Sequence, residues 1–356
     1  MRIIFDIGHP AHVHHFKNVI FKLMERGHRV LILAREKDVT IKLLRAYSLS
    51  FIIIGKNYKS LDKKALNQII VNLKTLKLCY KFKPDLLVGR ASPNLAFASF
   101  VLSIPFVAFS DTEHAKINYI TSFPFAKHVV TPSCFLRSLG RKHLRIDSYF
   151  ELAYLHPQYF QPDTSILEIL GVKEDERYII TRFVSWAASH DIGNRGLSIE
   201  MKRKLVKDLS KYVRVFISSE DELPHDLSSY QVIIPPEKMH DVLAFATIFI
   251  GEGATMASEC AMLGTPAIYV NTLSAGSLAE QENYGLIACY RNQSGLLEKA
   301  LGLLNTLGLK NSNRIRRQKM LAEKIDLAAF MVWFIENYPR SFEIMKKDPD
   351  YQYRFL

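Results

Sequence analysis

Short apolar runs alternate with longer amphipathic stretches through most of the chain. In the first half the apolar runs lie at 2–7, 28–33, 50–54, 85–89 and 105–110. Helical patterns separate them, at about 13–26, 39–47, 62–82 and 94–102. Strands separated by helices of this length predict βαβ units and a parallel sheet. Because the runs lack strict polar alternation, we expect both faces of the sheet to be buried.

The pattern is interrupted at 152–165, where Pro157 and Pro162 punctuate a polar stretch. Apolar runs then resume at 178–183, 213–218, 231–235, 247–251, 266–270 and 285–289. The sequence therefore predicts two doubly wound α/β domains, 1–158 and 159–324, which suits 356 residues. The remaining segment, 325–356, is predicted to be helical, and packing back on the first domain is one alternative for it. Ligands are expected in a cleft between the domains, beyond the carboxyl ends of the strands.

Composition narrows the function classes. Hydrophobic residues make up 48% and charged residues 23%, as in globular proteins, and no apolar stretch approaches the roughly 20 residues of a membrane span. Cys79, Cys134, Cys260 and Cys289 are too scattered for a metal motif and suit a reducing cytoplasm. The net charge of +12 favours anionic partners such as nucleotides, phosphorylated lipids or a membrane face. No nucleic-acid-binding motif is present.

The segment 247–270 carries the clearest binding signal. A predicted strand ends at Gly251, and Gly253 and Ala254 let the backbone approach a ligand closely. A helix beginning near Thr255 would offer its free N–H groups to a diphosphate. Glu259, four residues later on the same helix face, could accept hydrogen bonds from a ribose diol. An ordinary β-turn-α unit with purely structural glycines is the alternative.

Two further strand ends carry candidate catalytic groups. The first is followed by His9, His12, His14 and His15. One of them could be a general base, because the imidazole pKa lies near neutrality; a metal site or a polar helix cap are the alternatives. Asp111, Glu113 and His114 follow the strand 105–110, where Asp111 or Thr112 could instead cap a helix.

Two other segments have both a purely structural and a functional interpretation. The stretch 181–196 is either a solvated loop or a phosphate-binding one, with candidate side chains Arg182, Ser185, Ser189, His190 and Arg195. The helix 62–82 mixes lysines with apolar side chains. A core-facing helix with a solvated lysine face is favoured, and peripheral contact with an anionic bilayer, at the inner face of the membrane, is the alternative. The apolar residues assigned to the core face are Ile69, Ile70, Leu73, Leu76 and Leu78.

Together these segments resemble the GT-B superfamily of two-domain, nucleotide-sugar-using enzymes, over nearly the whole chain. The family most similar is domain of unknown function 354, which resembles the lipid-linked GlcNAc transferase of peptidoglycan synthesis and the non-hydrolysing UDP-GlcNAc 2-epimerases. His12 matches a histidine of the transferase's Gly-Gly-His turn, although Pro10 and Ala11 replace the glycines. The segments 89–99 and 110–114 match its Gly-rich loop and its acidic turn.

The strongest match is 251–266, where the GT-B glutamate at the position of Glu259 binds ribose and the small residues before it face the diphosphate. The stretch 155–163 is similar to the epimerases' interdomain linker. Their Thr-Gly-His-Arg-Arg loop is matched only at Thr181 and Arg182, and the transferase's donor-sugar motif only at Glu280, Gln281 and Asn283. These departures weaken the epimerase interpretation and leave the sugar open.

The resemblance implies a GT-B glycosyltransferase that uses a nucleotide-sugar donor, UDP-linked in the leading interpretation, without a metal or another cofactor. His12 is the first candidate for the base, followed by Glu113 and Asp111. The acceptor is open, and a lipid-linked or anionic molecule is one alternative. A nucleotide-sugar 2-epimerase, a UDP-sugar hydrolase and a non-catalytic binding protein are the other hypotheses. The donor-binding candidates are Arg182, Ser185, His190, Gly253, Ala254, Thr255, Glu259 and Gln281.

Overall fold

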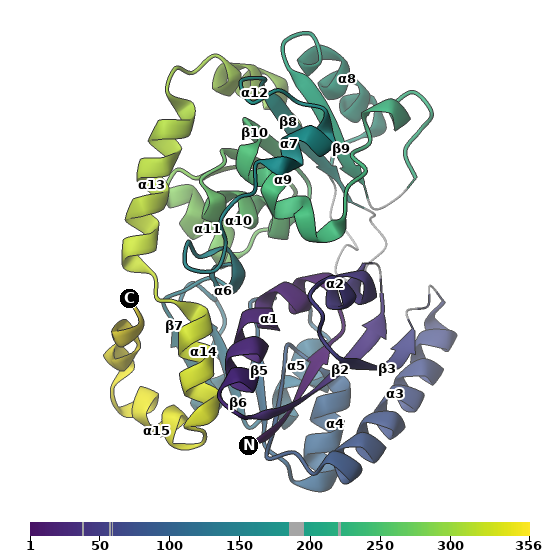
Figure 1. The fold of residues 1–356 in the computed structure, drawn as a ribbon, viewed down its shortest axis with the longest axis vertical. Helices are drawn as coiled ribbons and strands as arrows, with labels where there is room; N and C mark the ends of the chain where they lie inside the picture. The colour runs from purple at the N-terminus through teal and green to yellow at the C-terminus, as the bar shows by residue number, and fades with distance from the viewer. Residues whose placement is uncertain (38, 57, 59, 185–195, 220–221) are drawn as a thin grey trace. The chain divides into compact units, whose positions relative to one another are not determined.

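A computed structural model describes residues 1–37, 39–56, 58, 60–184, 196–219 and 222–356. The chain forms two compact units (Figure 1). Unit 1 contains residues 1–159 and 324–356, and unit 2 contains residues 160–323. The sequence placed these boundaries at 158/159 and 324/325, one residue away in each case. The C-terminal helical segment thus belongs to the same unit as the N-terminal sheet.

Unit 1 is built on a seven-stranded sheet in the order β3-β2-β1-β4-β5-β6-β7, with every neighbouring pair parallel. The order reverses between β1 and β4, which is the switch point where doubly wound sheets bind ligands. The predicted strands from β1 to β5 are confirmed, whereas β6 and β7 had no sequence prediction. The bounds are β1 (Arg2–Ile7), β2 (Arg29–Glu36), β3 (Phe51–Lys56), β4 (Leu86–Gly89), β5 (Phe106–Phe109), β6 (His128–Pro132) and β7 (His143–Ile146).

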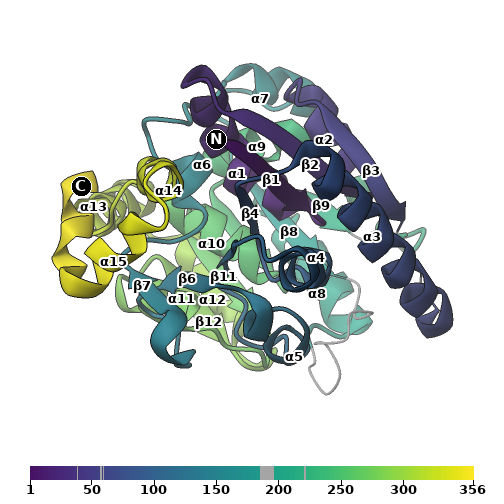
Figure 2. The ribbon, with the colours of Figure 1, turned by 90° about the horizontal axis from the view of Figure 1, so that it is seen from below.

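Helices cover both faces of this sheet. Phe16 of α1 and Phe334 of α14 pack edge-on against strand phenylalanines Phe5 and Phe109. On the other face, α3 and α4 bury Ile4 and their own apolar residues in a second cluster; Figure 2 shows α3 and α4 running beside each other. The helices are α1 (Pro10–Glu25), α2 (Thr40–Ala46), α3 (Leu61–Phe82), α4 (Pro93–Leu102), α5 (Asn118–Thr121), η1 (Phe123–Phe125), η2 (Gly140–Lys142), α6 (Leu152–Leu155), α14 (Leu327–Glu336), α15 (Arg340–Lys347) and η5 (Pro349–Phe355).

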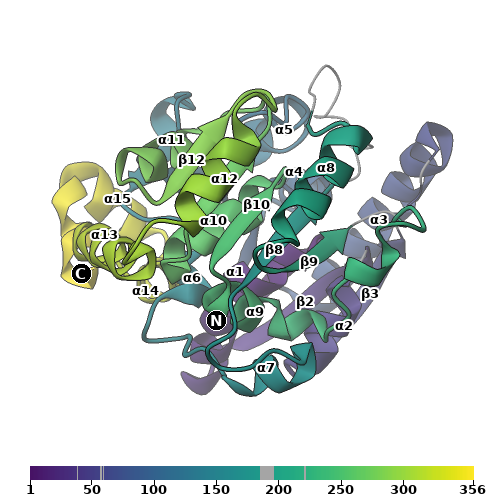
Figure 3. The same cartoon turned by 90° about the horizontal axis from the view of Figure 1, so that it is seen from above.

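Unit 2 is built on a five-stranded parallel sheet in the order β12-β11-β10-β8-β9, with its switch point between β8 and β10. Leucines of α8 and α12 pack on one face of it. Figure 3 shows these two helices over the sheet. The strands are β8 (Tyr178–Phe183), β9 (Arg214–Ser219), β10 (Ile248–Gly251), β11 (Ala267–Val270) and β12 (Ile287–Tyr290). The helices are α7 (Ser165–Leu170), α8 (Ile199–Leu209), η3 (Ser228–Tyr230), η4 (Pro236–Lys238), α9 (Met239–Phe245), α10 (Ala254–Leu263), α11 (Gly276–Asn283), α12 (Leu296–Leu304) and α13 (Leu309–Glu323).

One predicted strand is wrong. Within 231–235 only Gln231 forms a bridge, to Ile217, and the rest adopts no strand. Ile233 is 86% exposed, so the apolar run gains no burial from joining the sheet. Pro235 also lacks the N–H group that a strand needs, and a second proline follows it. The other five predicted strands of this unit are confirmed.

Candidate functional site

The turn between β10 and α10 brings bare backbone to the switch point of unit 2. A Cβ atom added to Gly251 would lie 2.5 Å from the Phe249 ring and 2.9 Å from Cβ of Arg182, so close packing requires glycine there. A Cβ on Gly253 would instead make an ordinary 3.5 Å contact with Val184. Gly253 is the N-cap of α10 and has no side chain to cap it. The first N–H groups of α10, at Ala254 and after, therefore form a potential anion site.

A buried carboxylate lies one turn into α10. Glu259 keeps 6% of its side chain exposed, and its Oε1 lies 3.0 Å from Nε2 of His240, itself buried in α9. A carboxylate only accepts, so the imidazole N–H donates this bond and orients Glu259. Thr255 is exposed, unlike Glu259, although both were expected to present one face to a ligand. Gln281 is fully buried and donates to Oγ of Ser258 (2.8 Å). Its own Oε1 has no hydrogen-bond partner among the described residues.

The end of β8 completes this side of unit 2. Nη1 of Arg182 donates to Oγ of Ser218 (2.7 Å) on β9, and the Arg182 side chain runs beside Gly251 and Gly253. Of the other predicted phosphate contacts, Ser185, Ser189, His190 and Arg195 lie outside the described residues.

Glu252 is a buried group that sequence reasoning missed. It is 1% exposed and accepts hydrogen bonds from the backbone N–H groups of Val184 (3.1 Å) and Leu197 (2.7 Å). Nζ of Lys202 lies 3.1 Å from its Oε2. These two N–H groups stand on either side of residues 185–195, so Glu252 ties both ends of that segment to the β10–α10 turn. The sequence does hold a signal for this residue, because Glu252 is a carboxylate between two glycines, Gly251 and Gly253.

His12 lies beside the switch point of unit 1, in the first turn of α1. The backbone N–H of Gly8 donates to its Nδ1 (3.3 Å), which places the proton of the neutral imidazole on Nε2. Burial, and next the charge of Arg90, hold the pKa of His12 well below its usual 6.5. His12 is therefore neutral at pH 7. A different histidine, His9, is the polar N-cap of α1, because its Nδ1 accepts the backbone N–H of Ala11 (3.2 Å).

Arg90, directly after β4, is the second group that the sequence did not predict. It is 7% exposed, and Nη1 donates to Nδ1 of His15 (2.7 Å). Nη2 pairs with Asp111 and also donates to Oγ1 of Thr112 (3.3 Å). Burial and Arg90 hold the pKa of His15 well below its usual range. Arg90 thus joins α1 to the segments that follow β4 and β5.

The acidic turn after β5 has structural partners on both carboxylates. The interpretation of Asp111 or Thr112 as a helix cap is wrong, because the next helix begins at Asn118. Asp111 is committed to Arg90. Glu113 is 6% exposed, and its Oε1 accepts the N–H of Leu136 (3.3 Å).

The four histidines of the first segment do not converge on one point. The ring of His14 stacks on the ring of Tyr154, with 5.2 Å between the ring centroids, whereas His15 accepts a hydrogen bond from Arg90. Within the described ranges, no group of three or more His, Cys, Asp or Glu side chains is placed to hold a metal ion. The expectation of chemistry without a metal or cofactor stays a prediction.

Known structures share this architecture. A UDP-GlcNAc 2-epimerase from Neisseria meningitidis, solved with UDP-GlcNAc, has a TM-score of 0.67 and 13% identity, covering 90% of this chain and 100% of its own. The glycosyltransferase SsfS6 from Streptomyces sp. SF2575, solved with thymidine diphosphate, has a TM-score of 0.59 and 14% identity, covering 94% and 99%. The fold is therefore GT-B, with two Rossmann-like parallel-sheet domains, as the resemblance predicted.

The chain belongs to the family described as "Protein of unknown function (DUF354)", whose family model matches residues 1–287. It is also similar to the uncharacterized protein MJ0665 of Methanocaldococcus jannaschii, with 26% identity over 276 residues, or 74% of this chain and 80% of that protein.

Proposed function

We propose that this protein is a glycosyltransferase that uses a nucleotide-sugar donor, with UDP as the first candidate nucleotide. One observation carries the proposal. At the switch point of unit 2, the N-cap of α10 is Gly253, which has no side chain to cap the helix, and one turn later α10 holds a buried, hydrogen-bonded carboxylate. The ligands with which the two GT-B neighbours were solved, UDP-GlcNAc and thymidine diphosphate, support the same ligand class.

In this proposal unit 2 holds the donor through the groups around α10. Backbone N–H groups from Gly253 to Thr255 meet the diphosphate, and the helix dipole stabilises the charge that develops as the diphosphate leaves. Arg182 adds a cation beside the same turn. Glu259 accepts from the ribose diol, and Gln281 acts on the sugar side. Ser185 and His190 stay predicted donor contacts.

Unit 1 supplies the base that removes a proton from the acceptor hydroxyl. His12 is the first candidate because its lowered pKa keeps it neutral at pH 7. To accept a proton at Nε2 it must carry its own proton on Nδ1, so the contact with Gly8 has to be replaced during the reaction. Glu113 and Asp111 come second, because each already accepts a bond that positions the turn.

A nucleotide-sugar 2-epimerase is the second candidate, favoured by the higher likeness to the Neisseria enzyme. Incubating the pure protein with UDP-sugars separates the candidates. A transferase turns over only when an acceptor is present, whereas an epimerase forms a new nucleotide-sugar. A hydrolase releases UDP without an acceptor, and a binding protein leaves every substrate unchanged. Only the first outcome supports the proposal.

The donor site itself is tested by Glu259→Gln. A hydrogen bond to a charged group contributes about 1.5–3 kcal/mol, so calorimetric titration should show UDP binding weakened by roughly 10- to 150-fold. Glu298→Gln, an exposed carboxylate on α12 of the same unit, is the matched control and should leave affinity unchanged. Equal UDP affinity in wild type and Glu259→Gln would remove Glu259 from the site.

We also propose that α3 brings the acceptor side to an anionic membrane surface. Three of the five residues assigned to the core face, Ile69, Ile70 and Leu73, are 57%, 43% and 59% exposed. With Leu66 (61%) they form one stripe, because residues three and four apart share a helix face. The lysines beside this stripe are also exposed, at Lys63, Lys74, Lys77 and Lys81.

An apolar stripe edged by lysines is the pattern of a helix that lies on an anionic bilayer. Phe100 and Val101 of α4, which packs against α3, are also 70% and 48% exposed. Among the described residues, no helix is long and apolar enough to cross a membrane, so contact would be peripheral.

Co-sedimentation with vesicles of anionic phospholipid tests this contact. Wild type should bind at low salt and bind less at high salt, because the lysine attraction is screened. The double variant Ile69→Ser, Leu73→Ser should lose binding. The control double variant Ile169→Ser, Leu307→Ser, at exposed positions of unit 2, should retain it. Absence of wild-type binding at low salt, or equal loss in both variants, would refute the contact.

A further inference from the structure

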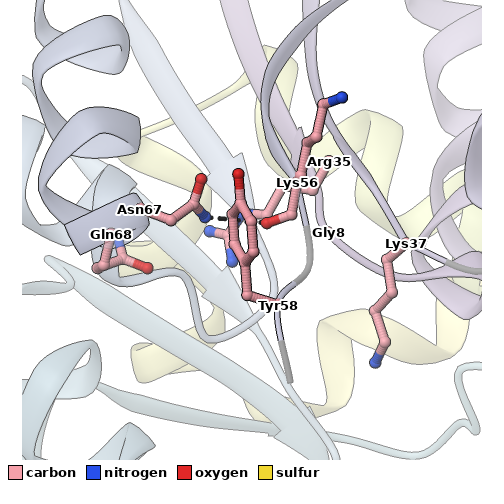
Figure 4. Close-up of a pocket in the computed structure, with 7 residues that line it drawn as sticks. All are labelled: Gly8, Arg35, Lys37, Lys56, Tyr58, Asn67 and Gln68. Atoms are coloured by element: carbon pink, nitrogen blue, oxygen red, sulfur yellow. Dashed lines mark hydrogen bonds between the residues drawn. The ribbon is translucent and has the colours of Figure 1, made fainter. Parts of the chain in front are cut away.

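A hollow of about 300 Å³ opens in unit 1 beside the carboxyl ends of β1, β2 and β3 (Figure 4). Its size is at the lower end for small-molecule sites. Among the residues that the structure describes, the lining holds three cations and no carboxylate. The lining residues are Gly8, Arg35, Lys37, Lys56, Tyr58, Asn67 and Gln68.

Local sequence builds this hollow from four elements. Gly8 follows β1, and a Cβ there would lie 3.7 Å from the guanidinium carbon of Arg35, so glycine leaves the space beside Arg35 open. At Gly55 of β3 a Cβ would lie 2.5 Å from Val71. That glycine lets α3 approach, and α3 supplies Asn67, whose Nδ2 donates to the Lys56 carbonyl (2.9 Å).

Arg35 is fixed at the base of the hollow. Its Nη2 donates to Oδ1 of Asn94 and lies 3.6 Å from Oδ2 of the buried Asp6. Nδ2 of Asn94 in turn donates to Oδ1 of Asp6 (3.2 Å). Over the part of the chain that the structure describes, Nε of Arg35 is buried without a hydrogen-bond partner. The protein thus orients this cation but does not satisfy all of its donors.

The charges of the described residues around the hollow leave a positive excess. Lys56 pairs with Glu36 at 3.5 Å, but both side chains are exposed, and such pairs contribute only about 0–1 kcal/mol. Asp6 offsets part of the charge of Arg35. Lys37 is the third cation of the lining. Figure 4 shows Lys37 on one side of the hollow and Asn67 and Gln68 on the other.

We propose that this hollow binds a phosphate group carried by the acceptor, the second substrate of the proposed reaction. A phosphate presents oxygens in several directions, so it can be contacted by groups on opposite walls, whereas a carboxylate is best met from one side. The volume leaves room for part of the molecule attached to it. The hollow also adjoins His12, because Gly8 lines it and donates its backbone N–H to Nδ1 of His12 (3.3 Å).

This proposal has two parts. The assignment of the phosphate to the substrate on which His12 acts rests on the proposed function. The binding of phosphate in the hollow is independent of that function.

Calorimetric titration of the full-length protein with inorganic phosphate, glycerol phosphate and succinate tests the site. Wild type should bind both phosphates more tightly than succinate. Lys37→Gln should weaken phosphate binding by about tenfold or more, which corresponds to about 1.4 kcal/mol. Lys77→Gln on α3 removes the same charge outside the lining and should have no effect. Tighter binding of glycerol phosphate than of the free ion would assign a phosphate ester.

Glu259→Gln distinguishes this site from the nucleotide site of unit 2. Phosphate binding that survives Glu259→Gln and is lost in Lys37→Gln supports the hollow, whether or not UDP binds elsewhere. Phosphate binding lost in Glu259→Gln but kept in Lys37→Gln would place the ion at α10 and overturn the proposal. Equal weakening by Lys37→Gln and Lys77→Gln would show an adventitious ion only, and succinate binding as tight as phosphate would overturn the ligand class.

An NMR titration of His12 gives a second readout. Bound phosphate offsets the charges of Arg35 and Lys37, so the His12 pKa should rise when phosphate is added. The rise should be absent in Lys37→Gln and present in Lys77→Gln. An unchanged His12 pKa at saturating phosphate would show that phosphate in the hollow does not act on His12, and would overturn the assignment of that phosphate to the substrate of His12.

Discussion

The two units place different chemistry at the same topological position. At the switch point of unit 1, side chains dominate: His12, His15 and Arg90 meet there from α1 and the end of β4. At the switch point of unit 2 the main chain dominates, because Gly253 stands at the N-cap of α10 without a side chain over the first turn. The same parallel-sheet edge therefore offers cations and imidazoles in one unit and backbone N–H groups in the other.

This difference predicts a division of labour. A backbone anion site suits the part of a substrate that is held throughout a reaction, whereas a neutral imidazole suits a proton that moves. Substitutions in unit 2 should then change nucleotide affinity, and those in unit 1 should change turnover. The following variants test whether the two effects separate.

The largest expected effect is that of His12→Ala on turnover. Removing a general base lowers the rate by about 10²–10⁴, while UDP affinity should stay unchanged because unit 2 holds the nucleotide. Steady-state kinetics and calorimetry on the same preparation measure the two quantities. A collapse of UDP affinity in His12→Ala would make this residue a phosphate contact and erase the contrast between the units.

Two controls sharpen the role of His12. His12→Gln keeps an N–H donor near the position of Nε2 but cannot act as a base, so full activity in this variant would show that His12 only donates a hydrogen bond. The pH profile is the second control, because the pKa of His12 lies below 6.5. Wild-type turnover should stay on its plateau down through pH 6.5 and fall only at more acidic pH, as the base becomes protonated. Loss of turnover in Glu113→Gln but not in His12→Ala would move the base to the acidic turn.

Arg90→Met should have the largest effect on stability. Removing one partner of a fully buried pair costs about 3–5 kcal/mol. Because Asp111 is 24% exposed and also accepts from Thr112, the loss should lie at the lower end of that range. Urea unfolding should show this loss in the free energy of unfolding. Arg26→Met is the matched control, since Arg26 is 56% exposed and pairs with Glu336; its effect should stay below about 1 kcal/mol. Equal effects of the two variants would contradict the place of Arg90 at the centre of unit 1.

The fold was predictable because strand and helix patterns are local. The runs at 2–7 and 178–183 coincide with β1 and β8, since each is mostly apolar and buried along nearly its whole length. β7 escaped prediction because it is four residues long and includes an exposed Arg145 and a buried His143. The error at 231–235 has the opposite cause: an apolar run is not a strand when tertiary contacts do not bury it.

The candidate site was predictable to a different degree in each unit. The turn at Gly251 and Gly253 shows in the sequence, because glycines, helix start and carboxylate lie within ten residues. The partners of these groups do not show there: His240 is 19 residues from Glu259, and Arg90 is 75 residues from His15. Only the order of strands in the sheet brings such pairs together. Arg90 was missed because one buried charge has no sequence pattern of its own, and Glu252 was missed although the glycines on either side of it were a signal.

The smallest expected effects come from the two glycines of unit 2, and they test the contrast most directly. Gly251→Ala forces a Cβ to within 2.5 Å of the Phe249 ring, so overpacking should cost about 1–3 kcal/mol in urea unfolding. Gly253→Ala makes an ordinary contact and should change stability by about 0.5 kcal/mol or less. Its methyl group would nevertheless stand at the backbone that is proposed to meet the diphosphate, so UDP should bind more weakly. If Gly253→Ala leaves UDP affinity intact, the N-terminus of α10 is an ordinary turn. The contrast between side-chain groups in unit 1 and backbone N–H groups in unit 2 would then fail.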